Sequence, residues 1–236
     1  MRFLPWWQGR RISDPAGNRL VRFRKVLEAA LTVPVYEASL RAARIDGKRG
    51  LNRITDIESV LRRMGVFSLN QIQVRLVGKR TANLVSPLPL AAGRDLGWNS
   101  DGCAVLRSQR AVLIRIGLEE GLLSPIERDG LWLRYGLPMF EHMIGLDGEL
   151  LAWECEAHSG LHVVEENVVF ELVQGELLLT SLTDLVQPTI QVRTGWLARI
   201  ETETCDCGRP GRRLAGLRQL ASRGAQRTRI AVAAHN

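Results

Sequence analysis

The chain has 236 residues, 45% of them hydrophobic, and a formal net charge of +7. This length suits one domain or one and a half, and the hydrophobic share excludes a disordered protein. No apolar run reaches the roughly 18 residues of a membrane helix, and the first residues lack the apolar stretch of a signal peptide. We therefore expect a cytoplasmic protein with no membrane contact.

The positive charge comes from the end of the chain. Residues 209–236 contain seven arginines and no acidic residue, whereas the preceding residues carry 25 basic and 25 acidic side chains. Such a segment could bind phosphate backbones, but it has no interleaved aromatic residues and no recognised nucleic-acid motif. We therefore expect a solvated basic tail over 215–236 and do not expect a nucleic-acid partner.

The N-terminal segment, residues 1–75, has the pattern of a small helical unit. After an irregular leader over 1–17, apolar residues recur at helical spacing over 18–30 and again over 33–46. Pro34 suits a first helical turn, where its missing N–H costs no hydrogen bond.

Two further helix starts are predicted by capping boxes, in which a Ser or Thr and the Glu or Gln three residues later satisfy each other's backbone N–H groups. Thr55 pairs with Glu58 in the first box, and Ser68 pairs with Gln71 in the second. Nothing in this helical segment carries chemistry.

Residues 76–130 are rich in Gly, Pro, Asn and Ser, which predicts loops with short strands. The apolar run at 111–118 is a buried strand or a buried helix, two states that periodicity does not distinguish. Cys103 has no partner in the pattern, and we expect a core thiol.

Residues 131–214 predict a small antiparallel sheet or barrel, because short apolar or β-branched segments alternate with glycine-containing turns. The expected strands cover 131–137, 149–157, 161–173, 175–182, 189–195 and 196–203. Asp147-Gly148 and Gln174-Gly175 fit hairpin turns. One helix is expected near 214–221. The predicted fold class is α/β: a helical segment, a truncated central sheet over 76–130 and an antiparallel β subdomain.

Three of the four cysteines and one histidine form a candidate metal site in this subdomain. Cys155 precedes His162 by seven residues, and Cys205 and Cys207 form a Cys-x-Cys pair. Thiolate and imidazole are the ligands that zinc prefers, and four protein ligands leave no position for water. We predict a structural zinc ion, with His158 as a competing ligand; the alternative is two buried cysteines and an unrelated pair.

A series of motifs in residues 131–214 follows the order of one known family. They are Tyr135-Gly136, Glu154-Cys155-Glu156, Gly160-Leu161-His162, Gly175-Glu176-Leu177, Arg193-Thr194-Gly195 and Cys205-Asp206-Cys207-Gly208-Arg209. With them the chain resembles the phenylacetate–coenzyme A ligase branch of the adenylate-forming enzymes, and residues 1–75 fit the same family. The resemblance implies an ATP-dependent acid–CoA ligase and supports the same four zinc ligands.

The chain departs from this family at residues that would act on the nucleotide. Met139 stands where the family has a magnesium-binding glutamate, and Trp196 stands where an aspartate takes the ribose hydroxyls. A thioether and an indole cannot replace these oxygens. The family's phosphate loop has no counterpart beyond the weak match Gly78-Lys79-Arg80-Thr81, and no lysine follows Lys79 to serve as the family's catalytic lysine.

These departures leave ATP and coenzyme A without most of the residues that would bind them. Tyr135, Gly136 and Arg193 would remain as a vestigial nucleotide site, although packing explains Tyr135 and Arg193 equally well. No catalytic residue is assigned.

Two functions remain open. The chain is either a degenerate, non-catalytic relative that keeps the zinc module as an interaction or scaffold unit, or an acyl- or aryl-acid activator completed by a separate protein. In both cases we expect a homo-oligomer or a partner that completes the sheet, with 111–118 as the exposed element.

Overall fold

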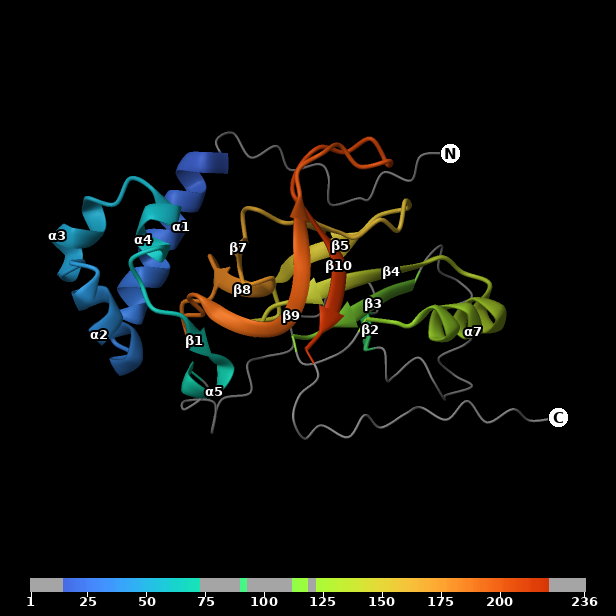
Figure 1. Cartoon of the computed structure of the whole chain (residues 1–236), viewed down its shortest axis with the longest axis horizontal. Coiled ribbons are helices and arrows are strands. Elements are labelled where there is room, and N and C mark those ends of the chain that lie inside the picture. Colours follow the sequence, from blue (N-terminus) through green and yellow to red (C-terminus); the bar gives the residue numbers. More distant parts are fainter. Residues whose placement is uncertain (1–14, 73–89, 93–111, 119–121, 221–236) are drawn as a thin grey trace.

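The computed structural model describes residues 15–72, 90–92, 112–118 and 122–220, with a helical unit at one end of a long sheet (Figure 1). Residues 1–14 of the predicted leader, Gly78-Lys79-Arg80-Thr81, Cys103 and residues 221–236 lie outside the described residues, and residues 15–17 of that leader are helical. Within the described ranges, no helix combines the length and the apolar character needed to cross a membrane.

Four helices form the N-terminal unit; the sequence predicted three of them, and α3 is the one that it did not predict. They are α1 (Pro15–Ala30), α2 (Pro34–Ala42), α3 (Gly47–Asn52) and α4 (Ile57–Leu61). Their core also takes in Val169, Ile190 and Val192 from the strand-rich part, so the helical unit packs directly against that part of the chain.

The predicted capping boxes are each half right. The helix α4 is capped by Asp56, whose carboxylate accepts a hydrogen bond from the Ser59 N–H at 2.8 Å, rather than by the neighbouring Thr55. At the second box, the Ser68 N–H donates to Gln71 Oε1 at 2.7 Å. This contact joins β1 (Phe67–Ser68) to α5 (Leu69–Ile72).

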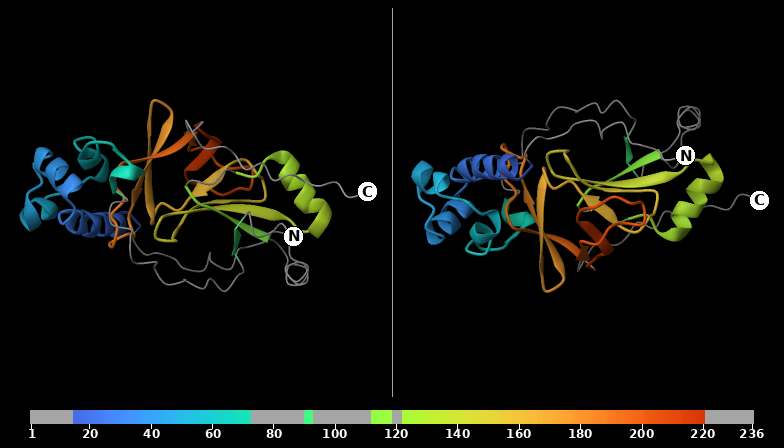
Figure 2. Two further views of the ribbon diagram at one scale, coloured as in Figure 1. Left: turned by 90° about the horizontal axis from the view of Figure 1, so that it is seen from below. Right: turned by 90° about the horizontal axis from the view of Figure 1, so that it is seen from above.

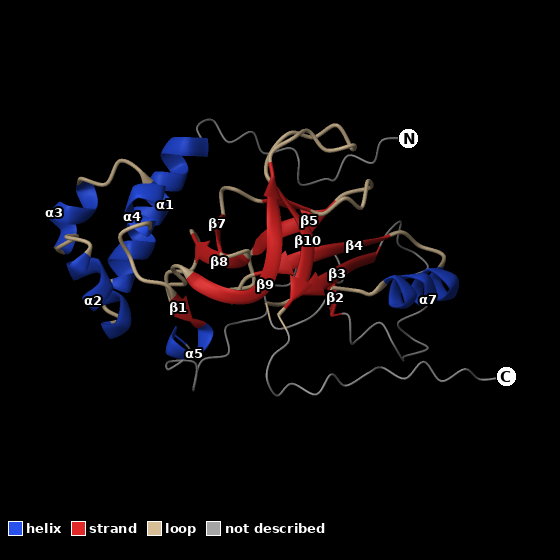
Figure 3. Cartoon of the chain, viewed as in Figure 1, coloured by secondary structure: helices blue, strands red, loops and turns tan. Residues whose placement is uncertain are grey.

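Ten strands of the described residues form one mixed sheet, drawn in red in Figure 3. After β1 they are β2 (Leu90–Ala92), β3 (Val112–Ile116), β4 (Met139–Ile144), β5 (Leu150–Glu154), β6 (Leu161–Val163), β7 (Val168–Val173), β8 (Glu176–Ser181), β9 (Val192–Glu201) and β10 (Arg213–Gln219). Their order is β2-β3-β4-β5-β6-β10-β9-β8-β7, and β1 pairs with β9. The expected central sheet and antiparallel subdomain are thus one continuous sheet of an α/β fold.

The pairing of neighbouring strands changes from parallel to antiparallel at β4. β2, β3 and β4 are parallel to one another, and every pair from β4 to β7 along the order is antiparallel. Four residues, 164–167, connect β6 to β7, although β10, β9 and β8 lie between these two strands. The antiparallel part must therefore curve back on itself, and Arg212 donates to the Phe170 carbonyl of β7 at 2.9 Å across this curve.

Residues 131–137 are not the expected strand. Helix α7 (Pro125–Tyr135) includes most of them, and Gly136 ends it in the left-handed conformation with φ of 64°. Ser124 and Glu127 form a complete capping box at its start, with Pro125 in the first turn. Applied at Ser124, the capping-box rule would have predicted this helix from the sequence.

The described part of the segment expected as a helix, residues 214–220, is not helical either. Residues 214–219 belong to β10, which pairs with β9 along its length and with β6 at residues 213 and 214. Long-range pairing therefore overrides the weak helical pattern.

The run at 111–118 is an inner strand rather than an exposed edge. β3 lies between β2 and β4, and Ile114, Ile116 and Leu118 are buried. The expectation that this run provides the exposed surface is therefore wrong. On one side it pairs with β2, which comes from the segment 76–130, where the sequence predicted loops and short strands.

Candidate metal centre

The structure brings Cys155, His162, Cys205 and Cys207 together at one end of the antiparallel strands. Cys155 follows β5, His162 lies in β6, and the two remaining cysteines lie in the turn between β9 and β10. Because β5, β6, β10 and β9 are neighbours in the sheet, loops that are about 40 residues apart in sequence meet here. The four ligand atoms all lie within 4.8 Å of one another.

Two of the six distances between these atoms match those around one tetrahedral ion, and none of the six exceeds 4.8 Å. Ligands at the usual zinc distances of about 2.0–2.3 Å should stand roughly 3.4–3.8 Å apart at the corners of a tetrahedron. Cys155 Sγ and Cys205 Sγ are 3.7 Å apart, and Cys207 Sγ lies 3.4 Å from His162 Nε2. Cys155, His162 and Cys205 are buried, which favours a closed site over an exposed catalytic one.

Local backbone contacts shape the two loops. The His158 N–H donates to the Cys155 carbonyl at 3.0 Å, which turns the chain directly after the first ligand. In the second loop the Gly208 N–H donates to the Cys205 carbonyl at 2.7 Å. Gly208 has φ of +80°, a conformation that disfavours other residues, so the glycine of the Cys-x-Cys-Gly motif has a direct structural reason.

Neighbouring side chains contact the ligands and orient them. Ser159 Oγ lies 3.3 Å from Cys205 Sγ, and the buried Arg213 donates to the same sulfur at 3.4 Å. Trp153 stacks on the His162 ring with centroids 4.8 Å apart, and Arg209 lies over Trp153. Such second contacts fix the geometry of metal ligands and tune their affinity.

The thiols differ in acidity. Burial raises the pKa of Cys155 to about 12. Burial also opposes ionisation of Cys205, but hydrogen bonds from Ser159 and from the Cys207 backbone outweigh it and lower the pKa to about 7. A buried thiol with a high pKa becomes a thiolate when a cation takes its proton's place, so the donor set is suited to a divalent metal ion.

His158 is not part of this set. Its Nδ1 atom lies 2.9 Å from Glu154 Oε1, and its ring stacks on Phe140. The competing ligand considered in the sequence is therefore directed towards a carboxylate outside the metal centre.

Two arginines just before the predicted basic tail form ion pairs. Arg209 pairs with Glu156 at 2.7 Å, and Arg213 pairs with Glu201 at 3.1 Å. The first pair holds the β9–β10 loop against the loop that carries Cys155, and the second joins β10 to β9.

The residues of the vestigial nucleotide site do not come together. Tyr135 and Gly136 lie at the end of α7, whereas Arg193 lies in β9 beside β1 and pairs with Glu176 of β8. Both views of Figure 2 show α7 and the N-terminal helices, next to which β1 lies, at opposite ends of the molecule.

Trp196 and Met139, which stand where the resembled family has an aspartate and a glutamate, are core residues. Trp196 is 1% exposed, packs in the cluster that contains Phe170 and Leu179, and donates its indole N–H to the Leu118 carbonyl at 2.7 Å. Met139 is buried against Ile114. These side chains complete the packing of the sheet and offer no ligand to a nucleotide or to magnesium.

A buried polar cluster next to the metal centre was missed in the sequence. Arg128 of α7 donates to Glu141 Oε2 at 2.6 Å and to Glu154 Oε2 at 3.1 Å. Burial raises the pKa of Glu141 to about 6, against the lowering effect of the Leu123 N–H. Glu141 belongs to β4 and Glu154 to β5, so only strand pairing shows that these residues are neighbours.

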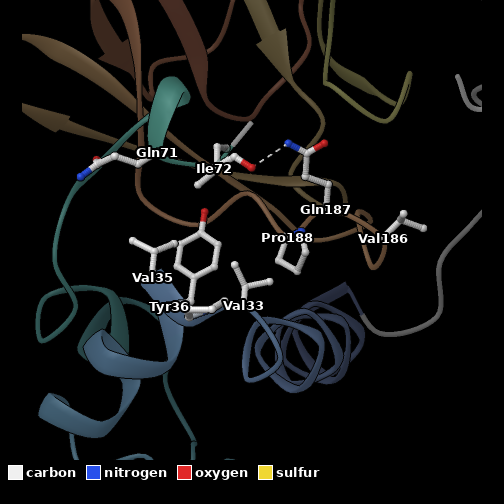
Figure 4. A pocket seen from close by; sticks show the side chains of 9 residues that line it. Val33, Val35, Tyr36, Gln71, Ile72, Val186, Gln187 and Pro188 are labelled. Atoms are coloured by element: carbon white, nitrogen blue, oxygen red, sulfur yellow. Dashed lines mark hydrogen bonds between the residues drawn. The ribbon is translucent and has the colours of Figure 1, made fainter. Parts of the chain in front are cut away.

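A cavity of about 330 Å³ lies between the helical unit and the β8–β9 loop, away from the candidate metal centre (Figure 4). It is lined mainly by apolar side chains, among them Val33, Val35 and Pro188, and Gln187 donates to the Ile72 carbonyl at its edge. No titratable pair or cluster of possible metal ligands among the described residues faces this cavity, so it contributes no recognisable chemistry.

Comparison with solved structures relates the fold to one enzyme. The chain matches 2-hydroxyisobutyryl-CoA ligase in the postadenylation state in complex with R3-HIB-AMP, with a TM-score of 0.62 and 11% identity over 93% of this chain and 72% of the ligase. It matches the same ligase in the thioesterification state, in complex with 2-HIB-AMP and CoA, with a TM-score of 0.59 and 13% identity over 91% and 71%. No family model and no curated protein sequence matches the chain. The shared feature is therefore the fold.

Proposed function

We propose that the chain is a degenerate relative of the phenylacetate–coenzyme A ligases, within the adenylate-forming enzymes, and that it acts as a zinc-containing interaction or scaffold module without catalytic activity of its own. The fold shared with 2-hydroxyisobutyryl-CoA ligase supports the wider group, and the ordered motifs support the branch. The Cys155, His162, Cys205 and Cys207 set supports a structural zinc ion, because all four positions are protein ligands.

The observation that carries the non-catalytic proposal is the position of Trp196. The family's nucleotide site needs a carboxylate here to hold the ribose, but this side chain is buried in the core and hydrogen-bonded to Leu118. Met139 at the magnesium position is buried in the same way. Stabilising the charge of a transferring phosphate needs oriented donors and a cation, and these two positions supply neither.

The experiment that tests this function is acid-dependent ATP–pyrophosphate exchange with a panel of aryl and fatty acids. We expect no exchange above background. Clear exchange by the unmodified chain would contradict the proposal and favour the acid-activating enzyme.

Metal content is tested separately. Protein purified under reducing conditions should carry about one zinc ion per chain, and Cys155→Ser or Cys205→Ser should lose it. Cys103→Ser is the matched control, because Cys103 lies outside the ligand set. Protein without zinc under these conditions would refute the structural zinc site.

A second function remains under consideration, in which a partner protein supplies the missing nucleotide-binding residues and the pair activates an acyl or aryl acid. The retained ligase-like fold is the observation that favours it. Exchange that appears only when the partner is added would support this alternative.

A further inference from the structure

Helix α7 is tied to the sheet by one arginine. Arg128 Nη2 donates to Glu141 Oε2 at 2.6 Å and to Glu154 Oε2 at 3.1 Å, and Arg128 Nη1 donates to the Met139 carbonyl at 3.1 Å. Both carboxylates are buried, and Glu154 directly precedes the metal-site residue Cys155. Hydrogen bonds between ionised groups are among the stronger ones in proteins, so this contact contributes much to the position of α7.

The metal-site loop reaches the same arginine through a second residue. His158 lies between the ligands Cys155 and His162, and its Nδ1 atom is 2.9 Å from Glu154 Oε1 and 3.5 Å from Arg128 Nη1. Its ring stacks on Phe140 of β4 with an angle of 7° between the ring planes. Thus two of the groups around Arg128 are next to or between the ligands Cys155 and His162: Glu154 ends β5 directly before Cys155, and His158 lies in the loop that follows.

Burial of apolar side chains contributes less than these polar contacts to holding α7 on the sheet. None of its residues is buried, and Ile126 and Leu133 are 79% and 84% exposed. Leu131 and Tyr135 are partly buried against Ile114 and Met139. A helix of this length with so little buried surface depends on its specific polar contacts.

We propose that α7 is a metal-dependent element, which stays on the sheet while an ion fixes the 155–162 loop and is released when the ion leaves. This inference rests on the proposed metal site. The ion would hold Cys155 and His162 in place. Glu154, bonded in the chain to Cys155, and His158, in the loop between the two ligands, would then stay at the distances that Arg128 needs.

The coupling must be reciprocal. If the ion stabilises the docked position of α7, then docking of α7 strengthens the binding of the ion by the same factor. A variant that weakens the Arg128 contact should therefore lower zinc affinity, although Arg128 touches none of the four ligands in the structure.

Hydrogen exchange of the full chain, with and without one equivalent of zinc, tests the inference. Without zinc, amides of residues 128–135 should exchange at least about tenfold faster, which is the change expected on losing one charge-assisted hydrogen bond. Amides of α1, in the helical unit, should change little. Arg128→Lys keeps the charge but places all its donors on one nitrogen, instead of the two guanidinium nitrogens that contact Glu141, Glu154 and the Met139 carbonyl. In this variant α7 should exchange rapidly even with zinc bound. Asp129→Asn, at an exposed position of the same helix, is the matched control.

The outcomes separate this inference from the metal site itself. One bound zinc with unchanged α7 exchange would overturn the inference and leave the metal site standing, whereas no bound zinc would refute both. A rise of equal size in α1 would also overturn it, because the response would then be global. Unchanged zinc affinity in Arg128→Lys, measured by chelator competition, would contradict the reciprocal coupling.

Discussion

Ser159 and Arg213 show how single residues set the properties of the metal centre. Both contact the sulfur of Cys205, and Arg213 also donates to Ser159 Oγ at 2.7 Å. Three thiolates around a divalent ion would carry a net negative charge, which a buried guanidinium offsets. The arginine therefore compensates charge, and the serine orients a ligand.

The Ser159→Ala variant should bind zinc about tenfold more weakly, because it loses a hydrogen bond to a ligand without losing the ligand. Competition with a coloured chelator measures this change. Ser181→Ala is a matched control, since Ser181 is a buried serine that contacts Thr183 and Asp184 in the β8–β9 loop. Equal affinity in Ser159→Ala and the wild type would show that the contact has no role in binding.

Asp184 predicts a pH dependence of stability away from the metal centre. Burial raises its pKa from 3.8 to about 6, and the N–H groups of Gln187 and Val186 partly oppose this shift. A carboxyl whose folded pKa lies above its unfolded pKa contributes stability that is complete below the unfolded value and is lost as pH rises through the folded value. This contribution should therefore disappear between about pH 4 and pH 6.

The Asp184→Asn variant removes this dependence and keeps an oxygen for the two N–H donors. It should match the wild type near pH 4 and be more stable at pH 7.5 by about 3 kcal/mol, because the pKa rises from 3.8 to about 6 and each pKa unit corresponds to about 1.4 kcal/mol. Urea unfolding at both pH values measures the difference, with the exposed Asp129→Asn as control. A variant that is less stable than the wild type at pH 7.5 would contradict the sign of the effect.

At the scale of elements, the close approach of β6 and β10 determines how the two metal-binding loops meet. The pairs Arg213–His162 and Leu214–Leu161 join these strands. Gly160, directly before β6, has φ of +112°, and a Cβ atom there would lie 2.4 Å from the Leu214 carbonyl oxygen. No side chain fits at this position without a backbone shift.

The Gly160→Ala variant should lose stability and metal together, because the clash separates the strands that carry both loops. Gly148→Ala is the matched control: Gly148 also has positive φ, at +86°, but a Cβ atom there meets nothing within 4 Å. We expect about 1–2 kcal/mol of destabilisation for the control and clearly more for Gly160→Ala. Thermal unfolding and zinc content report both effects, and equal losses in the two variants would rule out the close approach as the cause.

At the scale of the whole molecule, self-association remains a prediction. The sheet of described residues ends at β7, and strand edges invite pairing with another chain. Arg212 already occupies the Phe170 carbonyl, so the outer edge of β7 is partly protected. Part of this edge, including the half-exposed Leu172, remains available.

Light scattering at low micromolar concentration should therefore give a mass above the 26.4 kDa of one chain. Leu172→Lys should lower this mass, because a lysine on an edge strand opposes pairing. Val21→Lys, at an exposed position of α1, should leave it unchanged. A monodisperse monomer for the unmodified chain would contradict self-association.

The sequence by itself determined the features that depend on local spacing and side-chain chemistry. Helical periodicity predicted α1 and α2, and the Gln174-Gly175 turn has the two positive φ values, 54° and 82°, that its residues favour. The four residues that could hold a metal ion were also recognisable by type, since thiolate and imidazole are the ligands that zinc prefers.

The tertiary structure decided which side chains and strands meet. Whether 111–118 and 214–221 form strands depends on partners far away in the chain, and so do the burial of Trp196 and the contact of Arg128 with Glu154. Short apolar segments have no fixed preference of their own, because pairing and burial against distant residues supply most of their stabilisation.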